Sequence, residues 1–164
     1  MKPRYKAAQG RLGKVVAARL LPGTELIQGI ERICEDNGVK YVVVGCAIGS
    51  LSKSTFLIAM PKKDEPEKIA YSSLIEISGP IEFLGGQGIV CKDEKGETLT
   101  HFHASLTDKS GRVYGGHLVK GGNPTLVTTD LVIIEVKDVK FLRKYDEETG
   151  FVNFSTETEE TPTT

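Results

Sequence analysis

Apolar residues recur at helical spacing in one segment near the start of the chain. The segment follows Pro22-Gly23-Thr24-Glu25, which carries the signals of a helix start, and it ends at Asn37-Gly38. The apolar positions between these signals fall on one face of a helix. They are Leu26, Ile27, Ile30, Ile33 and Cys34. The pattern predicts one amphipathic helix over residues ~24–37, packed on a sheet.

Most of the remaining chain carries the alternating or continuous apolar runs that are typical of strands. Turn residues separate these runs at 61–64, 79–80, 93–96 and 121–124. The expected strands are 14–21, 39–45, 50–60, 68–78, 81–92, 97–106, 112–120 and 126–145, the last with a break inside it. Short strands with hairpin-sized turns predict a curved or partly closed, mostly antiparallel sheet. The predicted fold class is therefore α+β.

Length and composition bound the organisation of the chain. Its 164 residues, 39% of them hydrophobic, are enough for one compact domain with a real core. We expect this single domain to cover residues 1–154. From Ser155 onward the chain has no apolar residue, so residues 155–164 are predicted to form a flexible acidic, Thr-rich tail.

The charge of the chain is small but unevenly spread. A formal net charge of −1 gives no general electrostatic reason to bind nucleic acid. The first twenty residues carry bases without an acid, which could contact phosphates, although a solvated strand edge is the simpler interpretation. These bases are Lys2, Arg4, Lys6, Arg11, Lys14 and Arg19.

The length of the apolar runs and the spacing of the cysteines indicate the cellular compartment of the protein. No apolar run approaches the length of a membrane span, and the opening residues lack the apolar stretch of a signal peptide. The cysteines Cys34, Cys46 and Cys91 are odd in number and widely separated, and Cys34 and Cys46 fit core positions. We expect a cytoplasmic protein without membrane contacts.

All three histidines of the chain lie close together, at His101, His103 and His117. Alternate residues of a strand share a face, so the side chains of His101 and His103 point the same way. The polar segment 107–112 that follows is typical of a tight hairpin turn. A three-residue loop with Gly111 in the left-handed conformation pairs His103 with His117. A two-residue loop pairs His103 with Gly116 instead and turns His117 away, and we favour the first.

Three imidazoles on one sheet face would suit a divalent metal, with Zn²⁺ foremost and Fe²⁺ or Ni²⁺ as alternatives. Such a set leaves at least one coordination position for water or a ligand. The competing interpretation is that His101, His103 and His117 are ordinary polar strand residues, each satisfied by a carbonyl or by water. Because every histidine of the chain falls on one predicted face, we favour the metal site.

Glu76 and Glu82 are the carboxylates that we expect nearest a metal on the sheet, because each sits in an otherwise apolar strand. Glu76 could accept a hydrogen bond from a ligand or act as general base for a metal-bound water. An ion pair between Glu76 and Arg19 that fastens two strands is an equally good interpretation. No histidine remains outside the cluster, so any enzyme here would depend on the metal.

Several motifs together resemble the plant and prokaryote conserved (PPC) domain. They are Arg19-Leu20-Leu21-Pro22-Gly23, Gly45-Cys46-Ala47-Ile48-Gly49-Ser50, Glu76-Ile77-Ser78-Gly79, His101-Phe102-His103-Ala104-Ser105-Leu106 and Gly111-Arg112-Val113-Tyr114-Gly115-Gly116-His117-Leu118. The resemblance covers about residues 4–145. Within the family, the chain is similar to stand-alone prokaryotic members. It implies an α+β domain that assembles as a homotrimer, with the three histidines as a metal-binding set near subunit boundaries.

The resemblance also implies a link to DNA, because plant members join this domain to an AT-hook. This sequence lacks such a hook, so an affinity for DNA does not carry over from it. Two hypotheses follow. The first is a trimeric PPC-domain binding or regulatory protein, DNA-associated by resemblance, whose metal site is open to a small-molecule ligand. The second is a small metal-dependent enzyme that uses the same three histidines to activate water or polarise a carbonyl.

Overall fold

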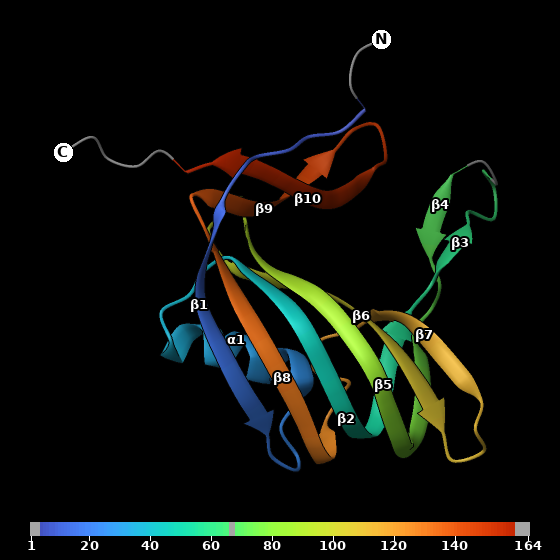
Figure 1. Ribbon diagram of the computed structural model, residues 1–164. Coiled ribbons are helices and arrows are strands. Elements are labelled where there is room, and N and C mark those ends of the chain that lie inside the picture. Colours follow the sequence, from blue (N-terminus) through green and yellow to red (C-terminus); the bar gives the residue numbers. More distant parts are fainter. Residues whose placement is uncertain (1–3, 66–67, 160–164) are drawn as a thin grey trace.

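The computed structural model describes residues 4–65 and 68–159, which form a large curved sheet with a helix against it and a small two-stranded sheet beside it (Figure 1). The fold is α+β and the sheet is mostly antiparallel, as the sequence predicted. Lys2 and residues 160–164 of the predicted tail lie outside the described residues. The elements are β1 (Arg11–Leu20), α1 (Leu26–Asp36), β2 (Val42–Leu57), β3 (Ala59–Pro61), β4 (Ile69–Tyr71), β5 (Ile75–Asp93), β6 (Thr98–Asp108), β7 (Val113–Leu118), β8 (Thr125–Lys137), β9 (Val139–Asp146) and β10 (Phe151–Thr158).

The main sheet runs in the order β1-β8-β2-β7-β6-β5-β9-β10, and β2 also pairs with β5. Strand β2 therefore pairs with β8 along one edge and with β5 along the other, while its last residues meet β7. Because β5, β6 and β7 are joined by hairpins, this circuit returns to β2 and closes part of the sheet. Strands β3 and β4 form a separate hairpin.

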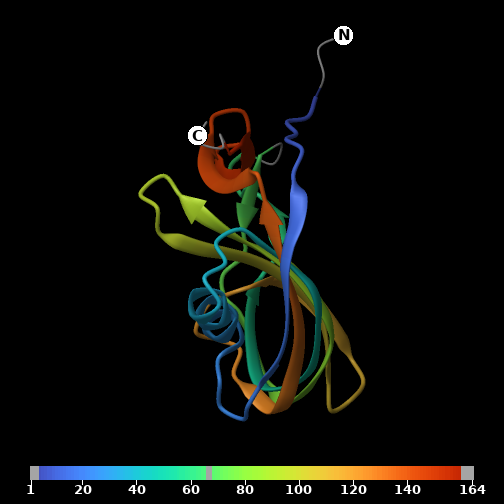
Figure 2. The same cartoon turned by 60° about the vertical axis from the view of Figure 1, so that its left-hand side comes forward.

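The predicted helix is confirmed as α1, which lies against one face of the curved sheet (Figure 2). The side chain of Glu25 caps its start by accepting a hydrogen bond of 2.8 Å from the backbone N–H of Gln28. Asn37 caps its end, and the apolar face is buried in the core. The buried members of that face are Leu26, Ile27, Ile30 and Cys34.

Strand β6 separates the core from the histidine face by strict alternation. Phe102, Ala104 and Leu106 point inward and are buried, whereas His101 and His103 occupy the opposite face. The glycines of β5 allow this packing, because a Cβ atom added at Gly86 would lie 2.3 Å from the Phe102 ring. Close packing of the core under β6 thus requires small residues on β5.

Two predicted breaks are absent, because β2 continues through residues 46–49 and β5 continues through Gly79-Pro80. At the second position the pairing with β2 shifts register between Leu51 and Lys53. A Cβ atom at Gly79 would lie 2.2 Å from the carbonyl oxygen of Ser52. Here the glycine serves close strand approach rather than a turn.

Residues 155–158, which we expected to be loose, form the second half of β10 and pair with β9. The ring of Phe154 packs 5.2 Å from that of Phe141, which anchors the strand. Backbone pairing and Thr propensity therefore compensate for the missing apolar residues. The predicted break inside 126–145 is confirmed at Asp138, whose φ is 67°. Among the described residues, no helix is long and apolar enough to cross a bilayer.

Candidate metal centre

The β6–β7 hairpin has the three-residue loop that places His103 opposite His117. The loop is closed by a hydrogen bond of 3.1 Å from the backbone N–H of Asp108 to the carbonyl of Arg112. Gly111 has a φ of 79°, in the left-handed region that glycine occupies cheaply. The predicted loop type and the predicted pairing are both confirmed.

The carboxylate of Asp108 organises this loop. It accepts hydrogen bonds from the backbone N–H and hydroxyl of Ser110, at 2.8 and 2.6 Å, and from the backbone N–H of Arg112 at 3.0 Å. The hydroxyl of Tyr114 donates a fourth at 3.1 Å. These donors, the Ser110 hydroxyl foremost, lower the pKa of Asp108 to about 2. The loop that sets the register of the histidines is therefore held by an ionised carboxylate.

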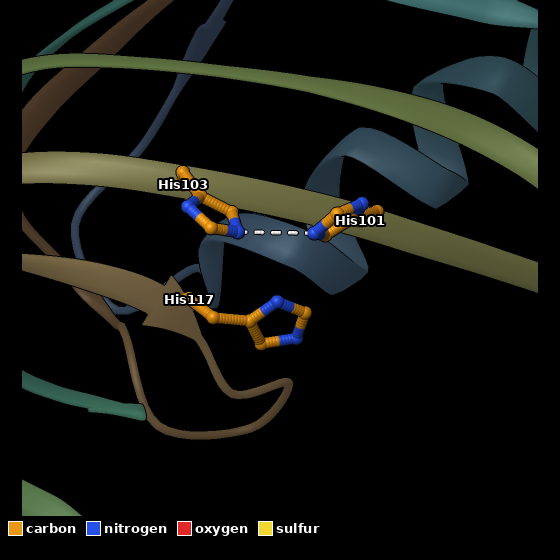
Figure 3. Close-up of side chains that lie close together, drawn as sticks. All are labelled: His101, His103 and His117. Carbon is orange, nitrogen blue, oxygen red and sulfur yellow. Dashed lines mark hydrogen bonds between the residues drawn. The ribbon is translucent and has the colours of Figure 1, made fainter. Parts of the chain in front are cut away.

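The imidazoles of His101, His103 and His117 face a common space (Figure 3). Ring centroids lie 4.9 Å apart for His101 with either neighbour and 5.3 Å apart for His103 with His117. The Nε2 atoms of His101 and His103 are 3.0 Å apart. One nitrogen from each ring lies within 4.8 Å of the others. The structure thus brings the three predicted ligands together.

The environment keeps these imidazoles neutral. Burial lowers the pKa of His101 to about 4, and the positive charge of Arg143 adds to the effect. Burial also lowers the pKa of His103 and of His117. A neutral imidazole has a free lone pair, which is the form that binds a metal ion. All three side chains are consequently neutral at neutral pH, which is the charge state that metal binding requires.

The donor set fits a divalent metal. A metal that binds two imidazoles at about 2.1 Å holds their nitrogens about 3.0 Å apart at right angles and about 3.4 Å apart in a tetrahedron. The His101–His103 nitrogen separation matches the lower value. Within residues 4–65 and 68–159, the buried Nδ1 atom of His117 has no hydrogen-bond partner. An unpaired buried nitrogen is costly, and a metal ion would satisfy it.

Three residues that the sequence did not single out surround the cluster. A guanidinium N–H of Arg143 in β9 donates to Nδ1 of His101 over 3.1 Å. The ring of Tyr71 in β4 lies 5.6 Å from that of His117, and Phe151 in β10 lies 5.7 Å from Tyr71. Arg143 reaches the site through a parallel pairing of β9 with β5. Parallel pairing across this distance in the chain leaves no turn signal in the sequence.

The candidate carboxylates, Glu76 and Glu82, are not part of the histidine cluster. Glu76 accepts a hydrogen bond of 3.4 Å from the Thr55 hydroxyl and lies 3.7 Å from the Lys53 ammonium. Glu82 is exposed on β5, where it pairs with Thr107. Arg19 donates to the Thr128 hydroxyl over 3.0 Å rather than to Glu76. None of the recorded contacts joins Glu76 to a histidine.

A hollow of about 390 Å³ lies beside His101 and His103 on the outer sheet face. Its floor includes the bare backbone of Gly45 and Gly88. A neighbouring hollow of about 680 Å³ extends from His103 over Gly85, Gly86, Gly115 and Gly116. The glycine-rich strands therefore leave room beside the histidines on one face and allow close packing of the core on the other.

Comparison with known proteins gives matches over most of the chain. The family model described as the Plants and Prokaryotes Conserved (PCC) domain matches residues 7–137. The bifunctional protein GlmU of Synechococcus sp. (strain JA-3-3Ab) is 32% identical over 144 residues. These residues are 88% of this chain but 21% of GlmU, so the chain spans about a fifth of the length of this curated relative.

Solved structures match nearly from end to end. A metal-containing protein from Archaeoglobus fulgidus has 26% identity and a TM-score of 0.77, over 92% of this chain and 99% of that one. A plant- and prokaryote-conserved (PPC) protein from Pyrococcus horikoshii has 26% identity and a TM-score of 0.76, over 92% and 97%. A Bacteroides thetaiotaomicron protein with a suggested DNA-binding role shares the fold at 15% identity, with a TM-score of 0.71 over 89% and 96%.

Proposed function

The chain belongs to the Plants and Prokaryotes Conserved domain family, and from this membership and the histidine cluster we propose that it is a metal-dependent binding protein. In this proposal His101, His103 and His117 hold one divalent ion, with Zn²⁺ as the first choice and Fe²⁺ or Ni²⁺ as alternatives. At least one coordination position remains open to a small ligand.

One observation carries the proposal: three neutral imidazoles converge while the buried Nδ1 atom of His117 has no partner among the described residues. An ordinary buried polar group in a strand would be expected to pair with a neighbouring carbonyl or side chain instead. The Archaeoglobus fulgidus relative, which is called metal-containing, supports the same interpretation. When bound, the metal would supply a Lewis-acidic centre that polarises whatever occupies the open position.

Elemental analysis of the purified protein tests the metal. We expect close to one equivalent of a divalent metal per chain in the unaltered protein and strong losses in His103→Ala and His117→Ala. Ser105→Ala is the matched control, because Ser105 lies on the same face of β6 and outside the cluster. It should retain the metal. A protein that contains no metal and takes up neither Zn²⁺ nor Co²⁺ on titration would overturn the proposal.

Two features of the family enter as further proposals. Homotrimeric assembly is proposed from the family resemblance, and light scattering of the purified protein measures it directly. DNA association is proposed from the same resemblance and from the suggested role of the Bacteroides thetaiotaomicron fold neighbour. Binding to duplex DNA that falls steeply with salt near physiological ionic strength would support it. Flat binding curves would remove it.

The alternative is a metal-dependent enzyme built on the same histidines. It needs a general base, and the contacts of Glu76 are with Thr55 and Lys53. We therefore place the binding function first. Hydrolysis or carbonyl chemistry that disappears in both His103→Ala and Glu76→Gln would reverse this order.

A further inference from the structure

Arg143 is a half-buried cation, and its hydrogen-bond acceptors among the described residues are neutral. One guanidinium N–H donates to Nδ1 of His101 over 3.1 Å, and another donates to the carbonyl of Val152 over 2.5 Å. In the described part of the chain, no carboxylate forms an ion pair with it. A guanidinium has five N–H donors, so three remain after these two contacts.

A bound metal would concentrate positive charge at this place. A divalent ion on three neutral imidazoles would sit one ring away from the guanidinium of Arg143, which contacts His101 directly. Like charges in a partly buried site repel strongly. Because the described residues supply no carboxylate to the cluster, an anion from outside the chain would offset this charge.

The hydrogen bond between His101 and Arg143 also indicates an anion at this place. Since a guanidinium only donates, Nδ1 of His101 accepts in this structure and its proton lies on Nε2. If Nε2 of His101 binds the metal, the neutral ring carries its proton on Nδ1 instead. Two donors, the Nδ1–H of His101 and the Arg143 guanidinium, then face each other. An oxyanion between them would accept from both, in the place where metal-binding histidines commonly meet a carboxylate.

The surroundings leave room for a small molecule that carries such a group. Tyr71 of the β3–β4 hairpin lies beside His117, and Phe151 of the β9–β10 hairpin lies beside Tyr71. A cleft of about 930 Å³ opens between these hairpins and is lined by both aromatic residues. Tyr71 therefore contacts the histidine cluster on one side and lines this cleft on the other.

We propose that the protein binds its metal together with an oxyanion, a carboxylate or a phosphate, and that Arg143 holds this anion. The inference rests on the proposed metal site and assigns the chemical class of its ligand. Arg143 is a binding residue for the anion and not a ligand of the metal. Bound metal raises the affinity of the protein for the anion, and bound anion raises its affinity for the metal by the same factor, because the coupling between two ligands is reciprocal.

Cobalt titration tests the coupling. Co²⁺ binding to the metal-free protein is followed by visible absorption at constant ionic strength, in chloride alone, with succinate or with inorganic phosphate. In the unaltered protein we expect at least one of these anions to tighten Co²⁺ binding about fivefold or more. In Arg143→Gln we expect neither anion to tighten it, while binding in chloride stays equal or becomes stronger. Chelation of free Co²⁺ by the anions affects both proteins alike.

Two further variants complete the design. Lys144→Gln removes the neighbouring cation of β9, which pairs with Glu157 on the surface, and should keep the full anion response. Arg143→Lys keeps the charge without the planar fork, so its response should be partial, and it replaces Arg143→Gln if that variant fails to fold by circular dichroism. Loss of the response in Lys144→Gln would overturn the inference, because surface charge would then explain it.

The outcomes separate the two proposals. A response to succinate alone or to phosphate alone supports the inference and identifies the group. Co²⁺ binding that neither anion changes overturns the anion site and leaves the metal site standing. Failure of the unaltered protein to bind either Co²⁺ or Zn²⁺ overturns the metal site itself, and the anion site with it.

Discussion

His103 and His117 are directly paired across β6 and β7, although a loop with a glycine in the left-handed conformation separates their strands. That pairing brings one histidine from each strand to the same face. Changing the loop by one residue would turn His117 to the opposite face, because strand side chains alternate. The geometry of the cluster therefore depends on Gly111.

Gly111→Ala tests this dependence. Because Gly111 has a φ of 79°, an alanine there costs about 1–2 kcal/mol or moves the loop. We expect a lower melting temperature and weaker Co²⁺ binding. Gly96→Ala is the matched control, because Gly96 has a φ of 84° in the β5–β6 turn, away from the histidines. It should lose similar stability with unchanged Co²⁺ affinity. Equal loss of affinity in both variants would contradict the role of the loop.

The stability of the metal-free protein should depend on pH through His101. Its pKa is about 4 in the folded protein and about 6.5 in an unfolded chain. Between these values the unfolded state binds more protons, so the free energy of unfolding falls as pH drops from about 6.5 to about 4. Urea unfolding after chelation measures it. His101→Asn should flatten the slope in that window, and an unchanged slope would argue against the buried neutral imidazole.

Tyr71 supports His117 from a separate hairpin, with ring centroids 5.6 Å apart. Tyr71→Leu removes an aromatic contact of about 0.5–1.5 kcal/mol, whereas Tyr71→Phe keeps the ring. We expect Tyr71→Leu to weaken Co²⁺ binding several-fold and to shift the NMR signals of the His117 ring protons. Tyr71→Phe should match the unaltered protein in both measurements. Identical behaviour of the two variants would show that the ring contact has no role.

Local rules predicted the features that depend on short stretches of chain. The alternation at His101 and His103 and the glycine at position 111 were enough to place the three histidines together. Arg143 was beyond such rules, because its approach to His101 depends on the pairing of β9 with β5. The turn predicted at Gly79 was wrong for a related reason. A glycine can either form a turn or allow a neighbouring strand to approach closely, and the choice depends on what lies opposite, which here is the Ser52 carbonyl.

Gly86 under the Phe102 ring gives a test of how the core supports the histidine face. A Cβ atom at Gly86 would lie 2.3 Å from Phe102, whereas one at the adjacent Gly85 would meet nothing within 4 Å. Gly86→Ala should therefore destabilise the protein by about 1–3 kcal/mol in urea unfolding, and Gly85→Ala should be nearly neutral. Adding Phe102→Leu to Gly86→Ala should cost less than the two single losses combined, because the smaller side chain relieves the overlap. Strictly additive losses would mean that the clash is relieved elsewhere in the sheet.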